Sequence, residues 1–169
     1  MPISKSLLNF LDRNKIKYEI IRHRVVFTAH DKAATLKIKP QEVAKSVVVS
    51  LDKKDHALAL IPANKNLNKE KLLTLINKQR QKTKLLSYKK IDFAEEKWMK
   101  ANLKGVKVGA TPAFGTFYKL PTFIDNALPK SSKLVTNAGD YEYSLKITLA
   151  TLLKADITIV KGNFSQVKK

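Results

Sequence analysis

AKSVVVSL at residues 44–51 and HALALIP at residues 56–62 are the stretches that decide the fold. Both are short apolar runs rich in strand-forming residues, and the polar residues 52–55 separate them. Two such runs joined by a short polar turn predict a β-hairpin. We therefore expect the domain to be built on a sheet around this hairpin.

Helices and further strands are predicted on both sides of the hairpin. Capping residues followed by apolar residues at helical spacing predict five helices, which begin near Ser4 (through about Asn14), Thr28, Asn68, Asp92 (through about Lys100) and Thr148. Apolar or alternating runs predict strands at residues 17–23, 84–88, 106–110, 117–124, 133–136, 141–147 and 156–160. The spacing shows no regular βαβ repeat, which favours an α+β fold with a mixed sheet over a doubly wound one. We expect one domain over residues 1–169, since its length suits one and no repeat or linker interrupts it.

The net charge points to a polyanionic partner. Lysine and arginine total 33 against 14 acidic residues, for a net charge of +19. Such a field attracts nucleic acid, anionic membrane or acidic protein, although basic residues can also serve solubility alone. The four arginines are Arg13, Arg22, Arg24 and Arg80. Because lysine acts as a point charge on phosphate, the excess of lysine favours contact with a nucleic-acid backbone over reading of base edges.

Several classes of site are excluded or disfavoured by composition. The chain has no cysteine, which excludes disulfides, cysteine nucleophiles and thiolate zinc sites. Its histidines, His23, His30 and His56, are not spaced as a metal cluster, and no Ser/His/Asp triad is evident. We expect no metal and no cofactor. No signal peptide is recognised and no apolar run approaches the roughly 18 residues of a membrane span, so we expect a cytoplasmic protein.

Two segments carry residue types suited to chemistry. Lys45 stands at the start of an apolar strand, where a lysine must reach solvent or face a polar cleft. The loop from Gly109 to Gly115 is bracketed by glycines, which permit positive φ and close approach of the backbone to a ligand. Its N–H groups could hold an oxyanion or a phosphate. A solvent-facing lysine and an ordinary strand connection are the alternatives.

Polar residues at the ends of two later strands are weaker candidates. Asp125 follows the apolar residues 122–124, and Asn137 and Gly139 follow another strand. An acid at a strand end can orient a water or a base, or it can cap the following turn.

A basic stretch after the third predicted helix is a candidate nucleic-acid surface. Arg80, Lys82 and Lys84 lie in it, and no acidic residue occurs between Lys78 and Lys90. These side chains either contact the phosphate backbone of a nucleic acid or form a solvated connection.

Taken in order, these segments resemble the YbaK/ProX family of aminoacyl-tRNA deacylases, whose domain also occurs inserted in bacterial prolyl-tRNA synthetases. The resemblance runs from about residue 8 to 160 and leaves a basic tail at 161–169. It rests on the following positions: Ile16-Lys-Tyr-Glu19, His23, Thr28-Ala29, Ala33-Ala34, residues 43–49, Leu60-Ile-Pro-Ala63, residues 109–115, Phe123-Ile-Asp125, Asn137-Ala-Gly139 and Ser144.

The resemblance implies a fold and a reaction. The fold would be a curved, barrel-like mixed sheet flanked by helices, with a cleft for the 3′ end of a charged tRNA. The enzyme would hydrolyse the ester of mischarged tRNA, without a protein nucleophile and with the terminal hydroxyl of the tRNA helping to activate water. Partners would be mischarged tRNA and, as a second candidate, an aminoacyl-tRNA synthetase. A catalytically silent tRNA-binding or regulatory module and a generic basic RNA-binding protein are the alternatives.

The resemblance also assigns roles to residues. Lys45 matches the key lysine and would bind the terminal phosphate or the carbonyl side of the ester, while the backbone at Gly109 would cradle the carbonyl or the amino acid. The remaining substrate-binding candidates are Ser46, Ala110, Thr111, Gly115, Asp125, Asn137 and Gly139. The chain departs from the family's Gly-x-x-x-Pro loop, because Ala113 takes the fifth position and the proline is Pro112. The edited amino acid is therefore left open.

Overall fold

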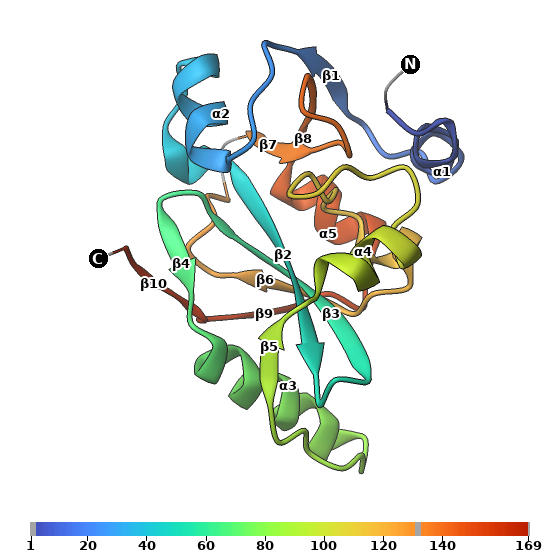
Figure 1. The fold of residues 1–169 in the computed structure, drawn as a ribbon, viewed down its shortest axis with the longest axis vertical. Coiled ribbons are helices and arrows are strands. Elements are labelled where there is room, and N and C mark those ends of the chain that lie inside the picture. Colours follow the sequence, from blue (N-terminus) through green and yellow to red (C-terminus); the bar gives the residue numbers. More distant parts are fainter. Residues whose placement is uncertain (1–2, 131–132, 169) are drawn as a thin grey trace.

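A five-stranded mixed sheet forms the centre of the molecule (Figure 1). The computed structural model describes residues 3–130 and 133–168. The strand order is β5 (Ile91–Phe93), β2 (Ala44–Leu51), β3 (Asp55–Pro62), β6 (Thr122–Asp125) and β9 (Val160–Gly162). β2 and β3 form the predicted antiparallel hairpin, whereas β6 runs parallel to β3 and β9 parallel to β6. The predictions of the hairpin and of a mixed sheet are both confirmed.

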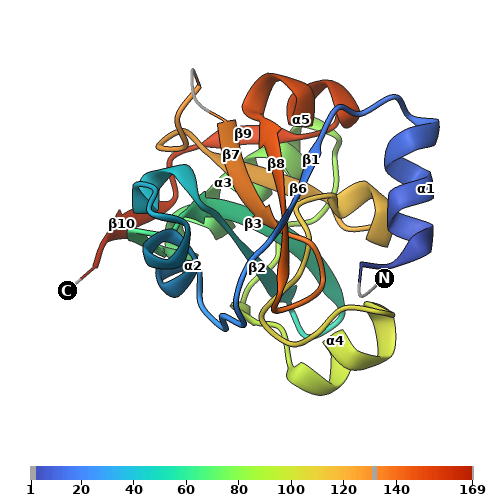
Figure 2. The same ribbon diagram turned by 90° about the horizontal axis from the view of Figure 1, so that it is seen from above.

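Two smaller sheets complete the β structure. β1 (Glu19–Arg22), β8 (Tyr143–Thr148) and β7 (Lys133–Asn137) form an antiparallel sheet that crosses β2 and β3 in Figure 2. β4 (Lys65–Leu67) pairs with β10 (Ser165–Val167). An isolated bridge between Val43 and Val135 joins the central sheet to the three-stranded one. Across the described ranges the strands form three sheets and no closed barrel, so the sheet is barrel-like only in its curvature.

The helices begin where capping side chains satisfy free backbone N–H groups. Their bounds are α1 (Lys5–Arg13), α2 (Ala29–Leu36), α3 (Lys69–Lys82), α4 (Glu96–Asn102) and α5 (Leu149–Ala155). Ser4, Thr28, Asn68 and Thr148 each accept a hydrogen bond from a backbone N–H in the first turn, as predicted. No helix in the described part of the chain is long and apolar enough to cross a bilayer.

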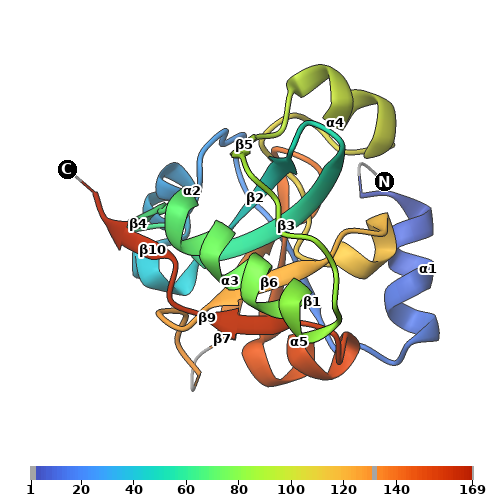
Figure 3. The ribbon, with the colours of Figure 1, turned by 90° about the horizontal axis from the view of Figure 1, so that it is seen from below.

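The hairpin is apolar on both faces because each face is covered. Leu58 and Leu60 of β3 pack into a core shared with α1 and the β1–β8–β7 sheet. Ala59 and Ile61, which alternate with them, pack on the other face against α3, which lies across the sheet in Figure 3. A strand buried on both faces reads as a continuous apolar run, which explains the composition of residues 56–62.

Four predicted elements differ from the structure. Residues 84–88 do not form a strand, because Lys84 has φ +60° and Tyr88 donates its N–H to the Asn77 side chain. The helix expected from Asp92 begins at Glu96, after β5. Residues 106–110 form a loop with Gly109 at φ +82°. The strand expected at 117–124 is a 3₁₀-helix, Gly115–Tyr118, followed by β6. Short apolar runs of this kind do not distinguish strand from turn by pattern alone.

Strands at the C-terminal end were placed incompletely from sequence. The expected strand at 156–160 is displaced to Val160–Gly162, and β4 and β10 were not expected at all. These three-residue strands have too few residues to show an alternating pattern, and their partners are distant in sequence.

Candidate functional site

Lys45 and Gly109 line one cleft beside the open edge of β2. β5 pairs with β2 at residues 49–51 and Ala94 donates its N–H to the Val48 carbonyl, so the edge from Lys45 to Val47 is left open on the side of the cleft. The cleft has a volume of about 460 Å³. Its lining residues are Lys45, Ser46, Val47, Val48, Asn66, Leu67, Phe93, Ala94, Met99, Gly109, Thr111 and Gln166.

Lys45 is held partly out of water in this cleft. It is half-buried on β2, opposite Ile61 of β3. Burial lowers the pKa of its ammonium, and the nearby charge of Lys168 lowers the pKa further. A partly desolvated ammonium interacts more strongly with an anion than one in bulk water does. The side chain is therefore suited to contact a phosphate or a developing oxyanion.

Ser46 adds further polar groups at the same edge. In an antiparallel ladder the N–H and C=O of alternate residues point to the same side. Val48 accepts a hydrogen bond on its outer side from the N–H of Ala94, so the N–H of Ser46, two residues earlier, also points to the open edge. The Ser46 hydroxyl is buried and has no hydrogen-bond partner among the described residues. The Ser46 N–H is thus available to a ligand beside Lys45, whereas the enclosed hydroxyl points to the other face of the sheet from the Lys45 side chain.

The Gly109 loop is fastened to the turn after β7. Gly109 has φ +82°, a conformation that an L-residue with a side chain seldom adopts. Its carbonyl accepts a hydrogen bond from Nδ2 of Asn137 at 3.4 Å. The N–H of Gly139 donates to the carbonyl of Ala110 at 2.8 Å. Two of the predicted residues therefore act on the loop that carries Gly109.

A buried lysine that sequence reasoning missed completes this network. Lys32 of α2 is 3% exposed, and its ammonium donates to Oδ1 of Asn137 at 2.5 Å. Burial lowers the pKa of Lys32 to about 8. The ammonium is thus linked through Asn137 to the Gly109 carbonyl. Nothing in the local pattern signals this position, because the partner lies 105 residues away.

The pKa of Lys32 predicts a specific dependence of stability on pH. The folded pKa lies below that of an unfolded lysine, so the unfolded state binds more protons between about pH 8 and 10.5, and stability should rise with pH there. We expect the free energy of unfolding of the wild type to rise relative to that of Lys32→Met by up to roughly 3 kcal/mol over this window. Denaturant unfolding at several pH values measures the difference. Parallel pH profiles for the two proteins would contradict the buried charge.

The other predicted substrate-binding residues separate into three groups. Thr111 lines the cleft with Lys45, Ser46 and Gly109. Ala110, Asn137 and Gly139 lie outside its lining, and Asn137 and Gly139 hold the loop through Gly109 and Ala110. Gly115 and Asp125 also lie outside it.

Gly115 and Asp125 have packing partners elsewhere. A side chain at Gly115 would collide with Thr122, so this glycine permits a close approach of two segments. The buried carboxylate of Asp125 accepts hydrogen bonds from the backbone of Phe164 and Ser165. Asp125 thereby anchors the C-terminal segment that brings Gln166 to the cleft.

Six cleft residues were not anticipated from sequence: Asn66, Leu67, Phe93, Ala94, Met99 and Gln166. Asn66 and Gln166 come from β4 and β10, and Met99 comes from α4. The basic tail is therefore partly a strand that forms one wall of the cleft. Only the pairing of β4 with β10, about 100 residues apart, brings this wall together.

The three residues of the predicted basic stretch have different environments in the structure. Arg80 is not a free cation, since its guanidinium donates to the Tyr88 hydroxyl at 2.8 Å and to the Leu86 carbonyl. It also lies over the Tyr88 ring, 4.0 Å from the centroid. Lys82 and Lys84 are exposed. No cluster of three or more His, Cys, Asp or Glu side chains suited to a metal occurs within residues 3–130 and 133–168.

Comparison with known proteins identifies the family. The model of the aminoacyl-tRNA editing domain matches residues 23–155, most of the chain. The chain belongs to the aminoacyl-tRNA editing domain family. The match includes Lys45, Ser46 and the Gly109 loop, so this editing domain carries the candidate cleft within the family's own boundaries. β10, which contributes Gln166, lies beyond the matched residues.

Solved structures share the fold of this editing domain at low sequence identity. "Hypothetical protein APE2540" is 17% identical with a TM-score of 0.78, covering 96% of this chain and all of the other. A protein described as "a putative trans-editing enzyme for prolyl tRNA synthetase" is 16% identical with a TM-score of 0.79, covering 97% and 99%. A third, described as "a Putative signal transduction protein" from Marinobacter aquaeolei VT8, is 14% identical with a TM-score of 0.65, and the match covers 96% of this chain and 31% of that protein. No curated protein matches the sequence.

Proposed function

We propose that this editing domain is a trans-editing deacylase that hydrolyses the ester between an amino acid and a tRNA it does not belong to. The observation that carries the proposal is that Lys45, the open backbone edge at Ser46 and the Gly109 loop meet in one cleft. Ester hydrolysis requires donors directed at the charge that develops on the carbonyl oxygen. The family match to aminoacyl-tRNA editing domains supports the same reaction class.

The cleft suits a mechanism in which the protein positions the reactants. Water adds to the ester carbonyl, the tetrahedral intermediate collapses, and the C–O bond to the tRNA breaks as the departing hydroxyl takes a proton. The Ser46 N–H and the Lys45 ammonium can stabilise the developing oxyanion, or Lys45 can hold the terminal phosphate. The terminal hydroxyl of the substrate would help to activate the water.

The walls of the cleft favour a small amino acid. Val47, Leu67 and Met99 contribute apolar surface, while Asn66 and Gln166 add amide groups. A volume of about 460 Å³ must also admit part of the terminal nucleotide, which leaves limited room for a side chain. One methylene changes the free energy of binding by only about 1–3 kcal/mol. The hydrolysis rates of esters of small amino acids that differ by one methylene must therefore be compared directly.

The proposal is tested with the purified protein and a panel of mischarged tRNAs. We expect one or a few small aminoacyl esters to be hydrolysed and correctly charged tRNAs to be spared. A protein that binds every tRNA in the panel and hydrolyses none would instead be a catalytically silent tRNA-binding module.

We further propose that the enzyme acts in the cytoplasm on tRNA released by an aminoacyl-tRNA synthetase.

The basic end of α3 provides a prediction about tRNA binding. Lys82 and Lys84 are exposed, and each phosphate contact adds about 0.7–0.9 to the slope of log K against log salt. We expect the double variant Lys82→Gln/Lys84→Gln to flatten that slope by about 1.5, with similar losses for different tRNAs. Arg80 is left unchanged because it holds Tyr88. A slope equal to that of the wild type would show that Lys82 and Lys84 do not contact tRNA phosphates.

A further inference from the structure

A second and larger cleft lies at the opposite end of β3 from Lys45. Its volume is about 1170 Å³, and it is lined from α1, α3, α4 and the 3₁₀-helix Gly115–Tyr118. His56 and Trp98 stack at its border, with ring centroids 3.5 Å apart and planes within 10°. Burial lowers the pKa of His56, which favours the neutral form of the imidazole. The cleft therefore contains a flat aromatic platform.

The cleft is positively charged. Lys54, Lys104 and Lys119 line it with exposed side chains. The single carboxylate among its lining residues is that of Asp55, which accepts a hydrogen bond from the Tyr88 hydroxyl at 2.6 Å. Aromatic surface combined with several lysines is the arrangement that binds single-stranded nucleic acid, because bases stack and phosphates meet point charges. The volume also exceeds that of ordinary small-molecule pockets.

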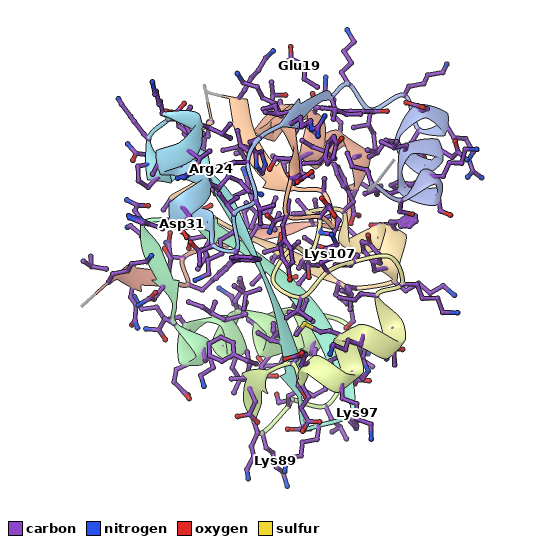
Figure 4. All side chains as sticks on the ribbon, turned by 45° about the horizontal axis from the view of Figure 1, so that its top comes forward. Glu19, Arg24, Asp31, Lys89, Lys97 and Lys107 are labelled. Atoms are coloured by element: carbon purple, nitrogen blue, oxygen red, sulfur yellow. The ribbon has the colours of Figure 1, made fainter. Side chains whose placement is uncertain are left out.

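A third depression shares lining residues with both clefts. A depression of about 660 Å³ shares His56 and Trp98 with the large cleft and shares Phe93 with the Lys45 cleft. Lys89 lines it, and in Figure 4 its side chain points away from the ribbon at the same end of the molecule as Lys97. Three carboxylates also line this depression, so the large cleft carries the stronger positive charge.

The distance between the two clefts suits an RNA strand. His56 pairs with Ser50, five residues along β2 from Lys45. Five residues of strand span about 17 Å, which corresponds to about five stacked nucleotides at ~3.4 Å each.

We propose that the large cleft binds the RNA strand that leads to the esterified 3′ end, with a base on the His56–Trp98 pair and phosphates on Lys54, Lys104 and Lys119. The proposal rests on the proposed function, since it assigns the path of the same substrate. Stacking and phosphate contacts carry little sequence information, so we expect the cleft to hold different tRNAs similarly.

The test uses the triple variant Lys54→Gln/Lys104→Gln/Lys119→Gln and uncharged tRNA. A matched control replaces Lys17, Lys37 and Lys154, which are exposed and line none of the three clefts. We expect the cleft variant to flatten the slope of log K against log salt by about two, and by at least one more than the control does. Equal slopes for the two variants would overturn the proposal.

Trp98→Leu tests the stacking platform independently of charge. We expect weaker tRNA binding by at least about fivefold at constant salt, with an unchanged salt slope. Thermal unfolding establishes that the variant is folded, and His56→Ala provides the second arm if it is not. Unchanged tRNA binding by a folded variant would show that no base stacks on the His56–Trp98 pair.

Hydrolysis of an aminoacyl ester of adenosine separates this inference from the proposed function. We expect the cleft variants to hydrolyse it at the wild-type rate, because it ends before the second cleft. Suppose that the wild type hydrolyses neither the adenosine ester nor mischarged tRNA, while the Lys54/Lys104/Lys119 variant binds tRNA more weakly than the wild type. The deacylase proposal would then be wrong, and the proposal that the large cleft binds RNA would be supported. If hydrolysis is observed and the variants bind tRNA as the wild type does, the RNA path fails alone.

Discussion

Lys45→Ala should reduce kcat/KM for ester hydrolysis by about 10²–10³, the loss typical of removing one donor to a developing oxyanion. The ammonium is half-buried at the cleft, where burial has already lowered its pKa. Removing it should not unfold the protein, because the variant no longer has to desolvate a charge. Steady-state hydrolysis of the preferred mischarged tRNA measures the effect, and denaturant unfolding shows that the fold remains.

Two further variants identify the cause of that loss. Lys45→Arg should recover little activity, since a planar guanidinium does not occupy the position of an ammonium. Lys146→Ala is the matched control, because Lys146 is also half-buried on a strand but lies outside the cleft. Wild-type turnover by Lys45→Ala, or an equal loss in Lys146→Ala, would remove Lys45 from the mechanism.

The second large effect is expected on stability, at Asp125→Ala. The Asp125 carboxylate is 2% exposed and accepts hydrogen bonds from the N–H groups of Ala127, Phe164 and Ser165 and from the Ser165 hydroxyl. Its removal leaves these donors without their acceptor and loosens the segment that carries β10. We expect the free energy of unfolding to fall by about 3–5 kcal/mol, measured by urea unfolding.

The matched control for this prediction is Asp92→Ala. Asp92 is also a strand carboxylate, but its side chain is exposed, so its replacement should change stability by less than about 0.5 kcal/mol. A similarly small effect at Asp125 would mean that the packing of Phe164 and the pairing of β10 with β4 are enough to hold the C-terminal segment.

Local pattern was sufficient for the elements whose causes are local. Two apolar runs joined by a polar turn predicted the β2–β3 hairpin, and Ser4, Thr28, Asn68 and Thr148 marked helix starts because a cap acts within three residues. The family resemblance selected Lys45 and Gly109, and both line the cleft. Pattern failed at residues 84–88 and 106–110, because positive φ at Lys84 and at Gly109 is incompatible with the extended backbone of a strand.

Features that depend on contacts between distant segments required the tertiary structure. By itself the sequence determined the hairpin, the capped helices, the positive charge and the lysine at the start of β2. Tertiary structure decided that Lys32 reaches the Gly109 loop through Asn137, that Asp125 anchors the chain end, and that Gln166 forms a cleft wall. The reason is physical: periodicity records which face of an element is buried, whereas a buried polar group takes its partner from whichever segment the fold places beside it.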